Sequence, residues 1–170
     1  MGYVKWYGHA AFEIQIDRKI VVVDPWISNP KSPIRRVDEL PKVDLIIVTH
    51  DHGDHLGEAV EIAKKNNCPI VSTYELANDL SKKGVEGIGA NIGGPIKIKD
   101  LIIILTPAMH SSTCGVPTGA IIRGEEATIY HAGDTGIFAT MELIGKMYSI
   151  DIAMLPIGGH FTCLLYTSYA

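Results

Sequence analysis

The chain has 170 residues, of which 46% are hydrophobic and 20% are charged, and its formal net charge is −4. These values are typical of one soluble globular domain, and the weak negative charge argues against nucleic acid as the main partner. No apolar run has the length of a membrane span, and the start lacks the apolar stretch of a signal peptide, so we expect no membrane association. The three cysteines are widely spaced and form no Cys-x-x-Cys pair, which favours the reducing cytoplasm over a disulfide framework.

The first part of the chain is predicted to be rich in strands. Residues 3–7 and 11–16 alternate between apolar and polar side chains, and a hairpin turn then leads into an apolar strand over 19–23 that ends at Asp24-Pro25. Residues 26–42 hold three prolines and scattered charges, so they are predicted to form a long loop. Long loops in compact domains often line binding sites.

Strands and helices alternate in the next segment. An apolar strand over 44–48 is followed by apolar residues at helical spacing from Leu56 to Ala63, by a short strand over 69–72 and by a helix over 73–83. This alternation predicts parallel strand pairing with right-handed crossovers. Residues 84–95 contain five glycines and are expected to be irregular.

The second half repeats the order of strand-rich segment, polar loop, helix and strand. The predicted strands are 96–98, 101–105, 118–123, 127–130 and 150–155, with a helix marked by Ile137, Met141, Ile144 and Tyr148. The shared order suggests two similar layers. Polar His or Asp residues follow the strands that end at 23, 48, 105 and 130, and one edge of a two-layer fold would gather them.

The most informative motif is Thr49-His50-Asp51-His52-Gly53-Asp54-His55, which follows the strand over 44–48 directly. Imidazole nitrogens and carboxylate oxygens are ligands that ions such as Zn²⁺ accept. His50 and His52 are two residues apart, so in extended backbone they point to the same side and can hold one ion. A solvated loop rich in histidine by accident is the competing interpretation, and the position after a buried strand argues against it.

The motif resembles the signature of the metallo-β-lactamase superfamily. Further segments agree with the metal-dependent hydrolase branch that is related to L-ascorbate-6-phosphate lactonase, namely Gly8-His9-Ala10, Asp24-Pro25, His110, His131-Ala132-Gly133-Asp134-Thr135-Gly136 and Leu155-Pro156-Ile157-Gly158-Gly159. The resemblance covers residues 1 to 162. It implies an α/β fold, an αββα sandwich with the site at one edge between the sheets.

The resemblance also implies a ligand set for two divalent metal ions, with Zn²⁺ favoured and Mn²⁺ as the alternative. His50, His52 and His110 would hold the first ion. Asp54 and His55 would hold the second, and Asp134 would bridge the two. Asp24, at the end of a strand, is expected to orient a ligand histidine. His9, His131 and His160 are candidates for the pocket, although a purely structural role is an equal alternative for each of them.

The end of the chain departs from the family pattern. The family continues after Gly-Gly-His-Phe-Thr with a helix and a strand that supplies one more histidine to the second ion, whereas no histidine follows His160 here. We therefore expect a domain over 1–162 that lacks its last helix and strand, an atypical tail over 163–170, and a weak second metal site.

The predicted function is a metal-dependent hydrolase. A metal-bound hydroxide would attack a small-molecule ester, lactone or phosphoester, and Asp54 would shuttle the proton. Two alternatives remain open at this point: a metal-binding fragment without catalysis, and a di-iron oxidoreductase with the same fold. The expected partner is a small-molecule substrate, and a homo-oligomer is compatible with the sequence.

Overall fold

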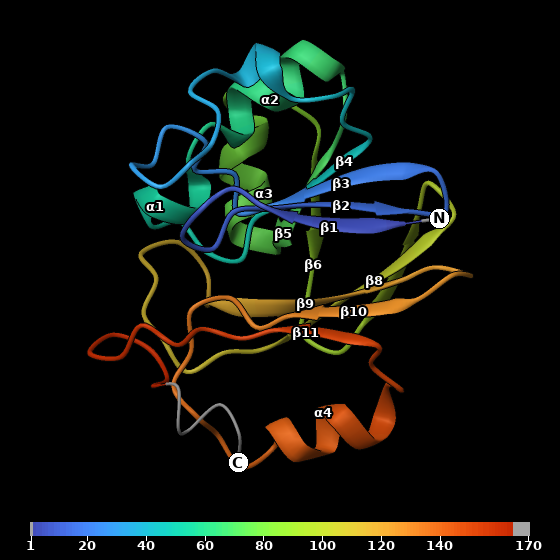
Figure 1. Cartoon of the computed structure of the whole chain (residues 1–170), viewed down its shortest axis with the longest axis vertical. Coiled ribbons are helices and arrows are strands. Elements are labelled where there is room, and N and C mark those ends of the chain that lie inside the picture. The colour runs from blue at the N-terminus through green and yellow to red at the C-terminus, as the bar shows by residue number, and fades with distance from the viewer. Residues whose placement is uncertain (1, 165–170) are drawn as a thin grey trace.

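Two β-sheets pack face to face in the computed structural model, which describes residues 2–164 (Figure 1). The first is a six-stranded sheet with its strands in chain order. Its strands are β1 (Tyr3–Trp6), β2 (Phe12–Ile16), β3 (Lys19–Val23), β4 (Leu45–Ile47), β5 (Ile70–Thr73) and β6 (Gly87–Ala90). The pairs β1–β2 and β2–β3 are antiparallel, and the pairs from β3 to β6 are parallel, as the alternation of strands and helices predicts.

The second sheet has five strands in the order β11-β10-β9-β8-β7. Its strands are β7 (Pro95–Ile98), β8 (Leu101–Pro107), β9 (Thr118–Arg123), β10 (Thr128–His131) and β11 (Ile152–Met154). The pairs from β7 to β10 are antiparallel, whereas β11 pairs with β10 in parallel. The antiparallel pairs agree with the predicted hairpins of this half of the chain.

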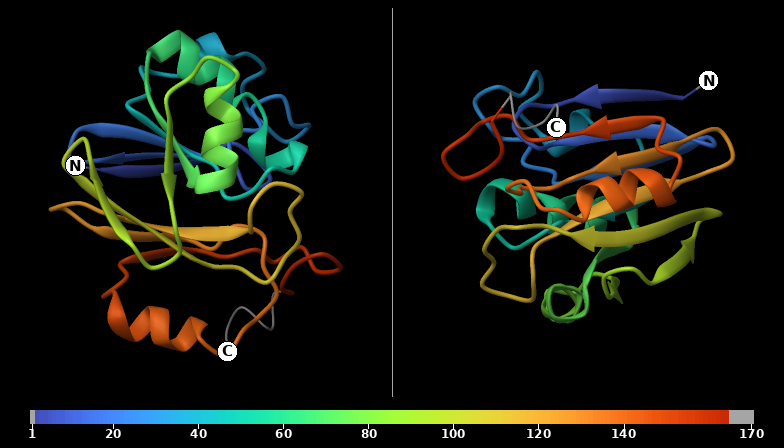
Figure 2. Two further views of the ribbon diagram at one scale, coloured as in Figure 1. Left: turned by 180° about the vertical axis from the view of Figure 1, so that it is seen from behind. Right: turned by 90° about the horizontal axis from the view of Figure 1, so that it is seen from below.

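Helices cover the outer faces of both sheets. They are α1 (Gly53–Leu56), α2 (Ala59–Asn66), α3 (Tyr74–Ser81) and α4 (Met141–Met147), and a short 3-10 helix covers Val37–Glu39. The first three lie beside the first sheet, and Figure 2 shows α4 across the outer face of the second. The predicted αββα sandwich is therefore confirmed. None of the helices in residues 2–164 is long and apolar enough to cross a membrane.

The core follows from the alternation of side chains along the strands. On β3, Val21 and Val23 point between the sheets, whereas Val22 points toward the helices. The layer between the sheets joins residues such as Ile47 of the first sheet to Ile122 of the second, and both are fully buried. Apolar burial on both faces of the first sheet accounts for its nearly continuous apolar strands.

The expectation that residues 84–95 are irregular is wrong for Gly87–Ala90, which pair with β5 as the parallel strand β6. The glycines are there because α3 packs closely against this strand. A Cβ atom at Gly87 would lie 2.1 Å from the carbonyl oxygen of Ala77, and one at Gly89 would lie 3.0 Å from the Cα of Tyr74. A glycine-rich composition therefore reflects close packing here and not a loop.

Replacement of Ile47 by alanine should lower the free energy of unfolding by about 2–5 kcal/mol, because it removes buried methyl groups and leaves a cavity between the sheets. The matched control is Ile137→Ala, since Ile137 is 53% exposed and its loss should change stability by less than about 0.5 kcal/mol. Chemical denaturation of the two variants measures the difference. Equal destabilisation would contradict the placement of Ile47 in the core.

Candidate metal centre

Loops that follow four strands meet at one edge of the sandwich. Asp24 follows β3, His50 follows β4, His110 follows β8 and Asp134 follows β10. The Nε2 atom of His55 lies 3.3 Å from Oδ2 of Asp134, so side chains from the two halves of the chain are in contact distance here. The expectation that the strand ends gather their polar residues at one edge is confirmed.

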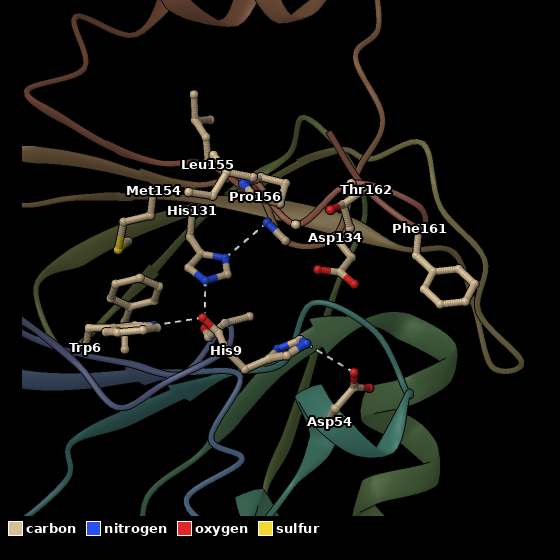
Figure 3. A pocket seen from close by; sticks show the side chains of 16 residues that line it. Trp6, His9, Asp54, His131, Asp134, Met154, Leu155, Pro156, Phe161 and Thr162 are labelled. Carbon is tan, nitrogen blue, oxygen red and sulfur yellow. Dashed lines mark hydrogen bonds and ion pairs between the residues drawn. The ribbon is translucent and has the colours of Figure 1, made fainter. Parts of the chain in front are cut away.

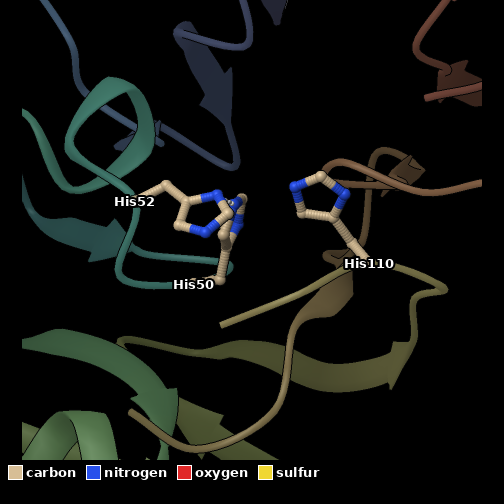
Figure 4. Close-up of side chains that lie close together, drawn as sticks. All are labelled: His50, His52 and His110. Carbon is tan, nitrogen blue, oxygen red and sulfur yellow. Dashed lines mark hydrogen bonds between the residues drawn. The ribbon is translucent and has the colours of Figure 1, made fainter. Parts of the chain in front are cut away.

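His50, His52 and His110 form the first group of potential ligands. Nε2 of His50 lies 3.0 Å from Nδ1 of His52, and the ring of His110 is 5.1 Å from that of His50 and 5.2 Å from that of His52. One ring nitrogen from each residue lies within 4.8 Å of the others. Figure 4 shows the ring of His110 facing the other two across a small gap.

The protonation of His50 follows from its neighbours. The hydroxyl of Thr49 has one proton, which it donates to Oδ2 of Asp24 at 2.7 Å. Nδ1 of His50, 3.0 Å from the same hydroxyl, must therefore be the donor in that contact. This tautomer leaves the lone pair of Nε2 free on the side of His52 and His110, as metal binding requires.

His50, His55 and Asp134 form a second group of potential ligands, which shares His50 with the first. His55 is fully buried, and its Nδ1 atom lies 2.7 Å from Oδ2 of Asp24. Its Nε2 atom is also buried, makes no hydrogen bond of acceptable geometry within residues 2–164, and lies 3.3 Å from Oδ2 of Asp134. A buried ring nitrogen without a hydrogen bond is costly, and a metal ion would satisfy it.

Asp24 fixes the position of His55 by a contact with the ring nitrogen that faces away from Asp134. Its buried carboxylate accepts hydrogen bonds from the backbone N–H of Thr49 at 2.8 Å and from the Thr49 hydroxyl, in addition to the contact with His55. The prediction that Asp24 orients a histidine is consistent with these contacts. In Asp24 the effect of burial, which raises the pKa, is outweighed by the neighbouring His55, so the pKa of this carboxyl is below its ordinary value.

The two buried histidines titrate in opposite directions in the protein without metal. Burial, helped by the nearby His55, lowers the pKa of His50 to about 4, so its imidazole is neutral at pH 7. Burial also works against protonation of His55, but the carboxylates of Asp24 and Asp134 raise its pKa to about 10. A metal ion that binds His55 must therefore displace a proton.

The distances between donor atoms fit a zinc-type ion. Bonds of 2.0–2.2 Å in a tetrahedral arrangement place neighbouring donor atoms about 3.3 Å apart. The observed separations of 3.0 Å, 3.3 Å and 3.7 Å lie around this value. The set of imidazoles and carboxylates also matches the ligands that such ions accept. The described residues therefore fit a metal centre.

The structure contains a third group of potential ligands, made of His9, Asp54 and His55. Nε2 of His9 lies 3.3 Å from Oδ2 of Asp54, and both side chains are partly exposed to the adjoining cavity. Asp54 and His55 lie on α1, the short helix that follows β4 in the chain. Sequence reasoning placed Asp54 and His55 here but left the role of His9 open.

His131 and His160 have different surroundings from the other candidates. Nε2 of His131 donates to the carbonyl oxygen of Ala10 at 2.9 Å, and its Nδ1 accepts from the N–H of Gly133 at 3.1 Å. Both nitrogens of His131 are thus occupied, although its ring borders the cavity. His160 is exposed, packs against Phe161 with 4.2 Å between the ring centroids, and is not among the residues that line the cavity.

A cavity of about 630 Å³ opens beside His9, Asp54 and Asp134 (Figure 3). Its walls are mainly apolar, and His9, Asp54 and Asp134 are among the polar residues that border it; the apolar lining includes Trp6, Phe12, Met154, Leu155, Pro156, Ile157 and Phe161. No lysine or arginine within residues 2–164 lines it. The space is large enough for a small molecule with its reactive group near the carboxylates.

Asp51 has a role that sequence reasoning missed. Its Oδ1 atom accepts hydrogen bonds from Ser112 Oγ at 2.8 Å and from Thr113 N at 2.9 Å, and its Oδ2 atom accepts from the hydroxyl of Thr113. These bonds tie the loop of His50 and His52 to the loop of His110. Its position between two candidate ligands was the only available signal, because its partners lie far away in the sequence.

Residues 19–163 match the model of the beta-lactamase superfamily domain, and this match covers most of the chain. The chain belongs to this superfamily. The family therefore agrees with the fold and with the cluster of histidines and aspartates described above.

Similar proteins show to which family within the superfamily the chain belongs. The chain is 59% identical over 165 residues to a UPF0173 metal-dependent hydrolase of Caldivirga maquilingensis, in an alignment that covers 95% of this chain and 72% of that protein. It is 56% identical over 173 residues to the protein of the same name from Hyperthermus butylicus, with coverages of 98% and 76%. The chain is thus a member of the UPF0173 metal-dependent hydrolase family.

Solved structures agree with this placement. A metallo hydrolase from the hyperthermophilic archaeon Ignicoccus hospitalis superposes with a TM-score of 0.92 at 46% identity, covering 97% of this chain and 74% of that one. A diiron beta-hydroxylase from Streptomyces venezuelae superposes with a TM-score of 0.72 at 18% identity, covering 89% and 34%. The second likeness concerns the fold alone.

The domain expected over 1–162 includes nearly all of the residues that match the family. Cys163, the first residue of the expected tail, is buried, and its backbone N–H donates to the carbonyl oxygen of Thr135 at 2.9 Å. The rest of the expected tail, from residue 165, lies outside the described residues.

Asp134→Asn should weaken metal binding more than Asp24→Asn. Oδ2 of Asp134 lies 3.3 Å from Nε2 of His55 and 3.7 Å from Nε2 of His110, whereas Asp24 hydrogen-bonds to the candidate ligand His55 through the more distant ring nitrogen, Nδ1. Loss of an orienting partner typically lowers metal affinity about 10–100-fold, and loss of a direct ligand should exceed this. Titration of both metal-free variants with Zn²⁺ measures the affinities, and equal values would exclude a special position for Asp134.

Asp51→Ala should weaken the binding of a metal ion by His50, His52 and His110 roughly 10-fold. This is the lower end of the range that is typical when a residue that orients a metal ligand is lost. The reason is that the loop of His110 loses its three hydrogen bonds to the motif loop. Asp51→Asn is the matched control, because it keeps one oxygen acceptor and should lose less. If the alanine variant binds metal as tightly as the wild type, the link between the loops has no part in the site.

Proposed function

We propose that this protein is a hydrolase that uses two divalent metal ions to cleave a small-molecule ester, lactone or phosphoester. The observation that carries the proposal is the position of Asp134, whose Oδ2 atom lies 3.3 Å from Nε2 of His55 and 3.7 Å from Nε2 of His110. One carboxylate thus joins two clusters of imidazoles beside an open cavity. Such a pair of sites is typical of metal-assisted hydrolysis.

In this proposal His50, His52 and His110 hold the first ion, and Asp54 and His55 hold the second, with Asp134 between them. The ions supply a Lewis acid and lower the pKa of a coordinated water molecule. We favour Zn²⁺, with Mn²⁺ as the alternative, because imidazole and carboxylate ligands suit both.

The chain's own residues position the reaction. Asp24 keeps the Nδ1 atom of His55 protonated and its Nε2 atom turned toward Asp134. Asp54 is partly exposed beside the cavity, where its carboxylate can accept the proton of the attacking water and pass it to the leaving group. The apolar walls hold the rest of the substrate and exclude water from it.

The lining of the cavity bears on the substrate. Because no lysine or arginine within residues 2–164 borders it, a phosphate group would depend on the metal ions for its recognition. Esters and lactones are therefore the first substrates to test, and the sequence resemblance to L-ascorbate-6-phosphate lactonase supports the choice of lactones. We further propose that the protein acts in the cytoplasm, as its cysteine content suggests.

Removal of metal should abolish hydrolysis. Treatment with a chelator followed by dialysis empties both clusters of their ions, and addition of Zn²⁺ or Mn²⁺ should restore turnover of a panel of ester, lactone and phosphodiester substrates. Elemental analysis of the active protein identifies the ion. Unchanged turnover by the metal-free protein would refute the proposal, and bound iron with redox turnover would favour an oxidoreductase instead.

A further inference from the structure

We infer that His9 is a ligand of the second metal ion, together with Asp54 and His55. This inference rests on the proposed two-ion function and adds a residue that the sequence resemblance does not place at the metal. The sequence resemblance gives Asp54 and His55 as ligands of this ion and leaves the role of His9 open. The structure places the side chain of His9 beside Asp54.

The distances between the side chains of His9, Asp54 and His55 suit a shared ion. Nε2 of His9 lies 3.3 Å from Oδ2 of Asp54, which matches the separation of about 3.3 Å between neighbouring ligands of a tetrahedral zinc ion. One donor atom from each of His9, Asp54 and His55 lies within 4.8 Å of the others. Figure 3 shows the imidazole of His9 directed toward the carboxylate of Asp54 at the border of the cavity.

The surroundings of His55 also favour an ion at this point. Its side chain is fully buried, and its Nε2 atom has no hydrogen bond of acceptable geometry within residues 2–164. The rings of His9 and His55 lie edge to face, 5.0 Å apart. A cation at this point would satisfy the orphaned nitrogen of His55 and, at the same time, bind the nitrogen of His9 and the carboxylate of Asp54.

The backbone and the ring of His9 are both held by neighbouring residues. The backbone of His9 has a φ of +51°, in the left-handed region that is costly for a residue other than glycine. Its carbonyl oxygen accepts a hydrogen bond from Trp6 Nε1 at 2.8 Å, and its ring packs edge to face on Trp26 with 5.5 Å between centroids. The ring thus contacts Trp26 and His55, and the backbone is held by Trp6, which favours the preorganisation that a ligand requires.

The second site then has a complete set of protein ligands in the described part of the chain. His9 and His55 supply imidazole nitrogens, and Asp54 and Asp134 supply carboxylate oxygens. Four ligands of this kind are enough for a zinc-type ion. A simple ion pair between His9 and Asp54 is the competing interpretation, and it predicts no effect of His9 on metal stoichiometry.

The test is titration of the metal-free full chain with Zn²⁺, followed by calorimetry, for the wild type and for His9→Asn. Asparagine tolerates a left-handed φ, so this variant removes the imidazole and preserves the backbone. We expect two ions in the wild type. In His9→Asn the first ion should bind unchanged, and the second should bind more than about 100-fold more weakly, beyond the usual effect of an outer partner.

His160→Ala is the matched control, because it also removes a histidine but lies outside the cavity lining, and it should bind both ions like the wild type. Co²⁺ in place of Zn²⁺ gives a second measurement, since loss of a nitrogen ligand changes the visible absorption of the second ion. Thermal unfolding of the metal-free variants checks that each one is folded.

The outcomes separate the two proposals. Two ions bound with the same affinities and the same Co²⁺ spectrum in His9→Asn would overturn the role of His9 and leave the proposed function standing. One ion in the wild type would overturn the second site, and with it both the role of His9 and the two-ion form of the proposed function. A wild-type chain that binds no metal would refute the proposed function itself.

Discussion

The hydrogen bonds of the buried Asp24 carboxylate are the interactions on which the candidate metal centre depends. The carboxylate receives two hydrogen bonds from Thr49, at the end of the neighbouring strand, and one from His55 on the helix that follows. A buried charge is expensive unless it is fully satisfied, so these three partners must stay where they are. The hydrogen bonds of this carboxylate thus set the tautomer of His55 and, through the Thr49 hydroxyl, that of His50.

A second constraint is the close approach of the two sheets at the same edge. The backbone carbonyl of Thr49 accepts hydrogen bonds from the N–H and the hydroxyl of Thr118, and Asp51 binds the loop of His110. Gly133 permits this approach, since it has a φ of +63° and a Cβ atom there would lie 3.2 Å from the Cβ atom of Thr49, which follows a strand of the first sheet. The candidate ligands His110 and Asp134 of the second sheet therefore lie close to His50 and His55 of the first.

The site combines rigid and accessible parts. His50, His55 and Asp24 are almost completely buried, while Asp54 and His9 are partly exposed beside the cavity. In the proposed centre the buried members would fix the geometry of the ions, and the exposed members would meet a substrate. This division is what a hydrolytic centre needs, because ligand orientation must persist while small molecules enter and leave.

The sequence by itself determined the fold class and the local motif. Alternating apolar strands and amphipathic helices specify a layered α/β fold, and the spacing from His50 to His55 places potential metal ligands together without any knowledge of the rest of the chain. The position of Asp24 after an apolar strand was enough to suggest its role. Only the tertiary structure decided the environments of His9, Asp51 and His131, because their partners are remote in sequence. It also decided that Gly87–Ala90 form a strand, since the need for glycine there comes from the approach of α3, which no local pattern contains.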